Sequence, residues 1–166
     1  MVEDENTKRL YESAKSYNKA SSILGATVNL QKNQNIDLIL PLVVNQALSL
    51  ELLVKSLCFV SGKNIKDTHH LDKLLKCLNG KVINSLEIHF SNLISEPKIK
   101  ENTSKLEASS GMKAPQNLEA ALKAWSKVFV SGRYAHELQG KQLFMLYHHE
   151  IFEVFSHEIR KQNPNW

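Results

Sequence analysis

The sequence has 166 residues, of which 42% are hydrophobic and 23% are charged, and its formal net charge is +4 at pH 7. This length fits one domain, and the composition excludes a disordered or fibrous chain and permits a sizeable core. The mild basicity permits contact with nucleic acid, nucleotides or acidic partners without requiring it. Arginine is scarce, because lysine supplies all but three of the 21 basic residues.

Three further features bear on the compartment. The cysteines, Cys58 and Cys77, are too few for a disulfide framework, and both lie in apolar helical patterns typical of buried free thiols. The N-terminal MVEDENTKRL is acidic and polar, unlike a signal peptide. The most apolar window, residues 38–60, is interrupted by polar and charged residues, whereas a bilayer span needs about twenty predominantly apolar ones. We expect a soluble, cytoplasmic protein without a membrane partner.

The periodicity is helical almost throughout, with no alternation of period two that would indicate strands. A first helix is expected over about residues 6–24, with Gly25 as its C-cap. A second ends near Gly62 and either starts near Asn35 with a kink at Pro41 or starts at Pro41 itself. The remaining predicted helices cover about residues 71–78, 81–95, 115–140 and 142–161.

Residues 97–114 are polar, rich in Lys, Glu and Ser, and nearly free of large apolar groups. We interpret them as a polar mobile loop, although so long a loop is uncommon in a compact domain and is then functional or disordered. No internal repeat is visible. The sequence therefore predicts one all-α domain over residues 1–166, an antiparallel bundle of five or six helices.

One carboxylate lies at the centre of an apolar stripe. When each residue advances by about 100° around the helix axis, Glu51 falls among Val44, Ala47, Val54 and Cys58, with Lys55 on the flank. The opposite side, expected to face solvent, carries Asn45, Ser49 and Ser56. Because a bare buried charge is costly, Glu51 is expected to be paired or to face a wet cleft. The alternative is an exposed i,i+4 pair with Lys55.

The stretch SGRYAHELQ, residues 131–139, concentrates polar chemistry at the end of another apolar stripe. If the helix continues through Gly132, the stripe holds His136, its flank Arg133 and Glu137, and the opposite face Tyr134. One interpretation is structural, with Arg133 paired to Glu51 or Glu137. The other is a polar cleft in which Arg133 grips an anion and a histidine exchanges protons.

Histidines near the C-terminus fall on two faces of the last predicted helix. His148 lies within the apolar stripe, so it is expected to face inward. His149, Glu153 and His157 lie together on the opposite face at i, i+4 and i+8. Such an exposed face lacks the convergent ligands and supporting shell of a metal site, so we predict neither a metal nor another cofactor.

Residues 46–78 carry a resemblance to a known family. The segment QALSLELLVKSLCFVSGKNIKDTHHLDKLLKCL resembles the central helical hairpin of HEPN-domain proteins: a long ALxLELLxKxL helix, a glycine, a short basic loop and a Thr-His start to an LxxLLxxL helix. His69 matches the histidine of that element, where a local capping role is the alternative. RYAHE also looks like an Arg-Tyr-x-x-Glu element found late in many HEPN-like chains.

The resemblance implies an antiparallel bundle, often homodimeric, in toxin–antitoxin, abortive-infection or CRISPR-linked defence systems. Active members are metal-independent ribonucleases that use an arginine followed four to six residues later by a histidine. This sequence departs from that pattern, because His136 comes too soon after Arg133 and His148 too late. Other HEPN-like chains act as binding or partner modules, for instance beside nucleotidyltransferases, and that role survives the departure.

Three functions follow as alternatives. The first is a HEPN-like module that binds RNA, a nucleotide or a protein partner, and the departure from the ribonuclease pattern disfavours an enzyme. The second is a divergent ribonuclease with Arg133 and His136 as catalytic residues, and the third is a structural interaction module. The expected polar cleft contains Glu51, Lys55, His69, Arg133, Tyr134, Glu137 and His148. Base stacking would draw on Tyr11, Tyr134, Tyr147 or Trp166.

Overall fold

The computed structural model describes residues 2–28, 32, 34–63, 65, 68–132 and 146–166. Within these residues the chain is all-α, as its periodicity predicts, and contains no β-strand. A short 3-10 helix, Ile36–Leu38, precedes the second helix. The α-helices are α1 (Val2–Thr27), α2 (Ile39–Val60), α3 (Leu71–Leu75), α4 (Gly80–Ile94), α5 (Pro97–Ser110), α6 (Leu118–Gly132) and α7 (His148–Gln162).

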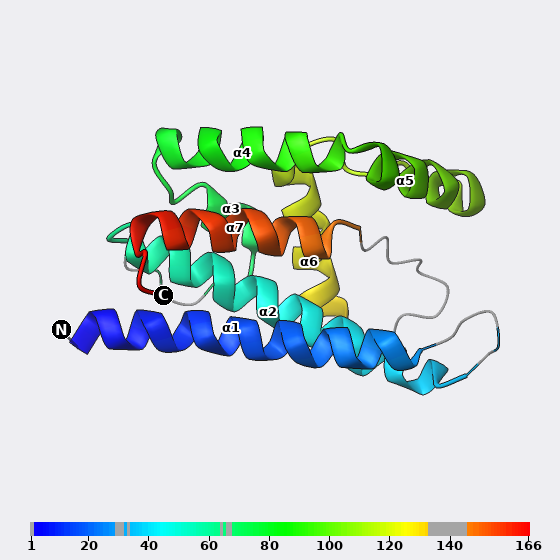
Figure 1. The fold of residues 1–166 in the computed structure, drawn as a ribbon, viewed down its shortest axis with the longest axis horizontal. Coiled ribbons are helices and arrows are strands. Elements are labelled where there is room, and N and C mark those ends of the chain that lie inside the picture. The colour runs from blue at the N-terminus through cyan, green and yellow to red at the C-terminus, as the bar shows by residue number, and fades with distance from the viewer. Residues whose placement is uncertain (1, 29–31, 33, 64, 66–67, 133–145) are drawn as a thin grey trace.

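Helix α2 is the centre of the bundle. It packs against α1, α3, α6 and α7, while α4 packs against α7 and α6 on the far side. Figure 1 shows α1, α2, α7 and α4 as successive rows, with α6 running across them. The helix begins two residues before Pro41, so the proline lies in the first turn, where its missing N–H costs no hydrogen bond.

Two serines correct the prediction for α2. The sequence places Ser49 and Ser56 on a solvent face, yet both side chains are fully buried. The reason is that α1 covers one side of α2 and α6 and α7 cover the other, so the helix has no wide solvent face. The length and composition of α2 would also suit a membrane span, but 56% of its most apolar window is buried among the other helices.

Helix α1 lies along α2 with small and hydroxyl-bearing side chains at the contact. Its buried face carries Thr7, Tyr11, Ala14 and Ser21, whereas Tyr17 is 38% exposed. The Ser56 hydroxyl donates to the Thr7 carbonyl across the contact at 3.4 Å. Gly25 does not end the helix, which continues to Thr27.

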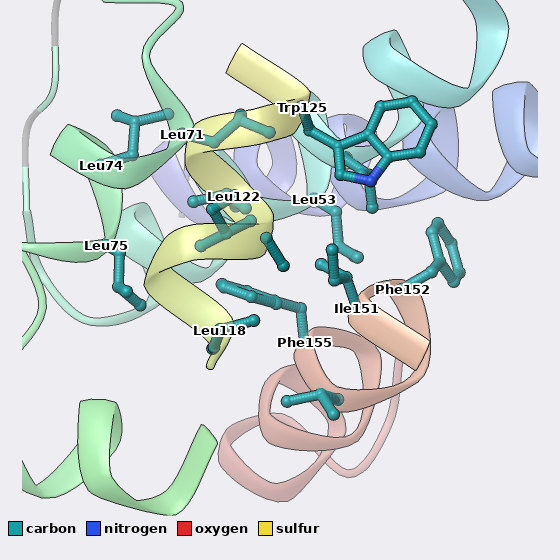
Figure 2. Packing of buried hydrophobic residues seen from close by; sticks show 14 of the residues in the cluster. Leu53, Leu71, Leu74, Leu75, Leu118, Leu122, Trp125, Ile151, Phe152 and Phe155 are labelled. Atoms are coloured by element: carbon teal, nitrogen blue, oxygen red, sulfur yellow. The ribbon is translucent and has the colours of Figure 1, made fainter. Parts of the chain in front are cut away.

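The core is a continuous cluster of apolar side chains from α1, α2, α3, α4, α6 and α7. Figure 2 shows Trp125 of α6 above Ile151 and Phe152 of α7, with Phe155 next to Leu118 and Leu122. The indole nitrogen of Trp125 donates to the Leu146 carbonyl at 3.0 Å. Cys58 belongs to this cluster, whereas Cys77, predicted to be buried, is exposed.

Residues Pro97–Ser110 form helix α5, which corrects the predicted loop at 97–114. The local signals are a proline in the first turn, a Lys105–Glu101 ion pair at 2.6 Å and Gly111 as a left-handed C-cap with φ of 70°. The helix buries no side chain, so its sequence lacks the apolar stripe by which a packed helix is recognised.

The start of α7 also differs from the prediction. The sequence places the helix from about residue 142, but Leu146 and Tyr147 are not helical, and α7 begins at His148. Tyr147 has φ of 65°, a left-handed conformation that cannot continue a right-handed helix. This boundary puts His148 in the first turn of α7.

Candidate functional site

Glu51 is a buried carboxylate with two cationic or potentially cationic neighbours. It is 5% exposed, in agreement with its place in the apolar stripe of α2. Its Oε1 atom lies 2.7 Å from Lys55 Nζ and 2.8 Å from His69 Nδ1. The i,i+4 pair with Lys55 therefore exists, but it is largely shielded from water rather than exposed. A shielded pair matters more for stability than a surface pair, because removing one partner leaves the other charge buried and unpaired.

His69 reaches Glu51 from the connection between α2 and α3. The predicted alternative was a capping role at the start of α3, but the residue at that N-cap position is His70, whose side chain makes no capping bond. The amide of Leu71 is instead satisfied by the buried hydroxyl of Ser126 on α6, at 2.8 Å. His69 thus connects the α2–α3 connection to α2 through its contact with Glu51, and its ring is about half exposed.

The second carboxylate oxygen of Glu51, Oε2, is buried and accepts no hydrogen bond from the part of the chain that the structure describes. Both Lys55 and His69 bind Oε1, so the carboxylate is held from one side. A carboxylate bound to Nδ1 fixes the orientation of an imidazole ring. The described arrangement can therefore position His69, while Lys55 is engaged by Glu51.

His148 forms a second polar contact between elements, a hydrogen bond that joins α7 to α2. Its Nε2 atom lies 2.9 Å from Ser49 Oγ, and the Ser49 hydroxyl lies 2.7 Å from the Gln46 carbonyl. A serine hydroxyl has one proton, so when it donates to Gln46 it accepts from Nε2–H of a neutral ring. The ring packs against Trp125 and Phe152, with centroid distances of 5.5 and 6.3 Å.

The surroundings of His148 favour the neutral imidazole. Burial, and secondarily the charge of His149, lower its pKa from 6.5 to about 4, and a hydrogen bond that the ring donates to the backbone carbonyl of Gln46 opposes the shift only in part. At neutral pH the ring is an uncharged hydrogen-bonding group. His148 accordingly faces inward as the sequence predicts, and its role there is structural, since it is hydrogen-bonded to Ser49.

An open groove lies between α1 and α7, and we call it the α1–α7 groove. It has a volume of about 500 Å³ and is lined by Tyr11, Lys15, Phe152, Ser156, Arg160 and Trp166, among others. The rings of Tyr11 and Trp166 stack with centroids 6.3 Å apart, and Lys15 Nζ lies 5.0 Å from the centre of the Tyr11 ring. Tyr11 is only 1% exposed, so Trp166 is the ring of this pair that the concave surface presents, beside two basic side chains and the carboxylate of Glu153.

The two cations in this groove differ in their partners. Lys15 binds Glu12 at 2.8 Å. Arg160 donates to the Tyr11 hydroxyl at 3.4 Å, and no carboxylate of the described residues lies within 4.0 Å of its guanidinium. The hydroxyl of Ser156, also in the groove, is buried and makes no hydrogen bond within the described part of the chain. The groove therefore offers a guanidinium without an ion-pair partner within 4.0 Å among the described residues, while the Ser156 oxygen is itself buried and Glu153 also lines the groove.

The sequence-predicted site is only partly brought together. Glu51, Lys55 and His69 meet, and His148 forms its own contact with Ser49. The other predicted members, Arg133, Tyr134, His136 and Glu137, lie outside the described residues.

The α1–α7 groove was not predicted, although Tyr11 and Trp166 were candidates for stacking. Arg160 and Tyr11 are 149 positions apart, so no local pattern joins them. Scarcity of arginine was the one signal in the sequence that pointed to Arg160.

Metal binding finds no support among the described residues, where no group of three or more His, Cys, Asp or Glu side chains is close enough to hold an ion. His149 lies 4.0 Å from Glu153, while His157 packs edge-on against His89. No protein-family model, curated protein or solved structure matches the chain, so membership of the HEPN family stays a prediction from the sequence.

Proposed function

We propose that this chain is a HEPN-like helical module that binds RNA or a nucleotide through the α1–α7 groove, without cleaving it. The observation that carries the proposal is the guanidinium of Arg160, which lies beside the stacked Tyr11 and Trp166 rings without a carboxylate partner among the described residues. A guanidinium binds phosphate with strong, charge-assisted hydrogen bonds. The partly buried Trp166 ring, which lies over the buried Tyr11 ring, can bind a base by stacking, which contributes about 1–3 kcal/mol per base.

The polar residues inside the bundle favour a binding module over an enzyme. Lys55 and His69 are engaged by Glu51, and His148 is a neutral ring bonded to Ser49. Each of these groups has a structural partner that a reaction would have to displace. The ribonuclease alternative depends on Arg133 and His136, whose spacing departs from the family motif.

Binding is tested by fluorescence anisotropy with a labelled single-stranded RNA of about 20 nucleotides, titrated with the full chain at several salt concentrations. We expect salt-dependent binding, because phosphate contacts release counterions. Arg160→Ala should weaken binding about tenfold, in line with the loss of one charge-assisted contact. Arg9→Ala is the matched control, because it also removes one guanidinium charge but does so outside the groove. Arg9 lies in α1, where it is exposed and paired with Glu5 at 2.7 Å.

Equal loss in the two arginine variants would show that net charge, not the groove, drives binding, and the proposal would fail. Absence of binding to RNA and to AMP would instead favour a protein partner. The same labelled RNA, run on a gel, tests cleavage. Cleavage that disappears in both folded variants Arg133→Ala and His136→Ala would establish the ribonuclease alternative.

The proposal includes a cytoplasmic, homodimeric protein in a prokaryotic defence or regulatory setting, with a nucleotidyltransferase-type protein as a possible partner class. The free thiols of Cys58 and Cys77 are what a reducing compartment maintains. Homodimerisation rests on the family resemblance. Light scattering coupled to size-exclusion chromatography measures it directly, and a mass of one chain at micromolar concentration would remove this part of the proposal.

A further inference from the structure

A second concave site lies on the other side of the molecule, between α4 and α5. It has a volume of about 400 Å³ and is lined by Ser91 of α4, Lys100, Thr103 and Ser104 of α5, Gln116 and Tyr147, with a few neighbours. We call it the α4–α5 pocket. Figure 1 shows α4 and α5 together along one edge of the bundle, away from α1. The α4–α5 pocket shares no lining residue with the α1–α7 groove.

The face of α5 that lines the pocket is polar, while Ile99 of the same helix packs against the core. Lys100, Thr103, Ser104 and Glu107 follow at i, i+3, i+4 and i+7, the spacing of one helix face, and all four line the pocket. Leu106 is 45% exposed on the same helix, which buries no side chain. A surface helix normally turns its apolar stripe inward. The polar face of α5 is thus suited to enclosing a polar molecule rather than to packing.

Tyr147 is held in a strained conformation at the wall of this pocket. Its φ of 65° is costly for a bulky residue, by roughly 1–2 kcal/mol. The side chain is 8% exposed, packs edge-on against Phe90 at 5.6 Å and brings its hydroxyl within 3.3 Å of Thr103 Oγ1. Backbone strain of this kind is concentrated at functional sites. Here it delivers a phenol hydroxyl to the pocket from the start of α7.

The charges of the pocket differ in how far they are satisfied. Glu107 accepts from the Ala114 amide at 2.8 Å and lies 3.9 Å from Lys113. Lys100, in contrast, has no carboxylate within 4.0 Å among the described residues. The pocket therefore combines one uncompensated ammonium with a lining of hydroxyl groups that both donate and accept hydrogen bonds.

We propose that the α4–α5 pocket binds a small phosphorylated polyol, with its phosphate at Lys100 and its hydroxyls among Thr103, Ser104 and Tyr147. An ammonium binds phosphate as a point charge, and the lining hydroxyls match a sugar-like skeleton rather than a flat base. The volume falls within the usual range for small-ligand sites, about 300–1,000 Å³. This site is independent of the nucleic-acid function proposed above, and either can fail without the other.

Nuclear magnetic resonance of the ¹⁵N-labelled full chain tests the proposal, with glucose 6-phosphate, glucose, gluconate and inorganic phosphate as separate probes. We expect glucose 6-phosphate to shift amide resonances of α5 and Tyr147 in a saturable way, and glucose to shift none. Weaker shifts with inorganic phosphate than with glucose 6-phosphate would support recognition of the hydroxyls. Tighter binding of gluconate than of glucose 6-phosphate would overturn the assignment of a phosphate.

Lys100→Ala should weaken binding of glucose 6-phosphate about tenfold or more, because a hydrogen bond to a charged group is lost. Lys98→Ala is the matched control, since Lys98 is an exposed lysine of the same helix outside the pocket lining. Equal weakening in both variants would show nonspecific attraction and overturn the proposal. So would the absence of saturable shifts with any of the four probes at about 20 mM, a concentration well above the dissociation constants of ordinary metabolite sites.

Discussion

The buried neutral state of His148 makes stability depend on acidity in a defined window. Its pKa is about 4 in the folded chain, against 6.5 ordinarily, so the unfolded chain binds more protons between these values. By linkage, folding stability is then fully present above pH 6.5 and decreases as the pH falls toward 4. The loss from this one group is about 2 kcal/mol at pH 5 and about 3 kcal/mol at pH 4.

The assay is urea unfolding of the parent, His148→Gln and His149→Gln at intervals from pH 4 to pH 8. His148→Gln removes the titrating ring, so its free energy of unfolding should depend less on pH than that of the parent, by about 2 kcal/mol between pH 7 and pH 5. His149→Gln is the control, because His149 is adjacent but exposed and is only the secondary cause of the low His148 pKa, so its pH dependence should stay close to that of the parent. The slopes are compared rather than the absolute stabilities, since either substitution can shift the whole curve.

Two results would refute this reasoning. One is a parent and a His148→Gln variant with the same pH dependence between pH 4 and pH 6.5. The other is a proton resonance titration in which the His148 ring shows its midpoint near 6.5, which would mean that the ring is solvated rather than bonded to Ser49.

Three further outcomes are expected. A double-mutant cycle of Glu51→Ala and Lys55→Ala should be non-additive by about 1 kcal/mol or more in urea unfolding, and additivity would rule out their shielded pair. A colorimetric thiol reagent at pH 8 should label Cys77 quickly and Cys58 only after unfolding, because burial raises the pKa of the Cys58 thiol to about 12; two rapidly reacting thiols in the native protein would contradict this. Gly111→Ala should destabilise by about 1 kcal/mol through backbone strain alone, since an added Cβ would meet nothing within 4 Å, and an unchanged unfolding midpoint would argue against the left-handed C-cap.

The sequence predicts the helical class and the inward position of Glu51 because both follow from the period of the apolar residues. A carboxylate in an apolar stripe is conspicuous, and the pairing that it requires is a local i,i+4 contact with Lys55. The second partner, His69, is 18 positions away along the chain, and it contacts Glu51 only because the α2–α3 connection folds back on α2. Helical periodicity does not predict a contact of this kind.

The errors have one physical origin, which is that burial depends on neighbouring helices. Ser49 is polar and lies off the main stripe, so its position along the helix does not predict burial. Helix α7 supplies the surface that covers it and the histidine to which it is hydrogen-bonded. Helix α5 presents the converse case. Its capping residues and its ion pair favour a helix. Its pocket-lining face is polar and the helix buries no side chain, so the sequence lacks the apolar period by which a packed helix is recognised.

The position of α2 among four neighbouring helices has a consequence for folding. Its amide hydrogens should exchange with solvent only when the whole bundle opens, and so report global stability. Until it is covered, the same segment is an apolar surface that promotes aggregation. Its most extensive neighbour, α1, precedes it directly in the chain, so the first covering contact needs little loop-closure entropy. Weakening the α1–α2 contact should therefore slow productive folding more than an equal loss at α4, and increase aggregation during refolding.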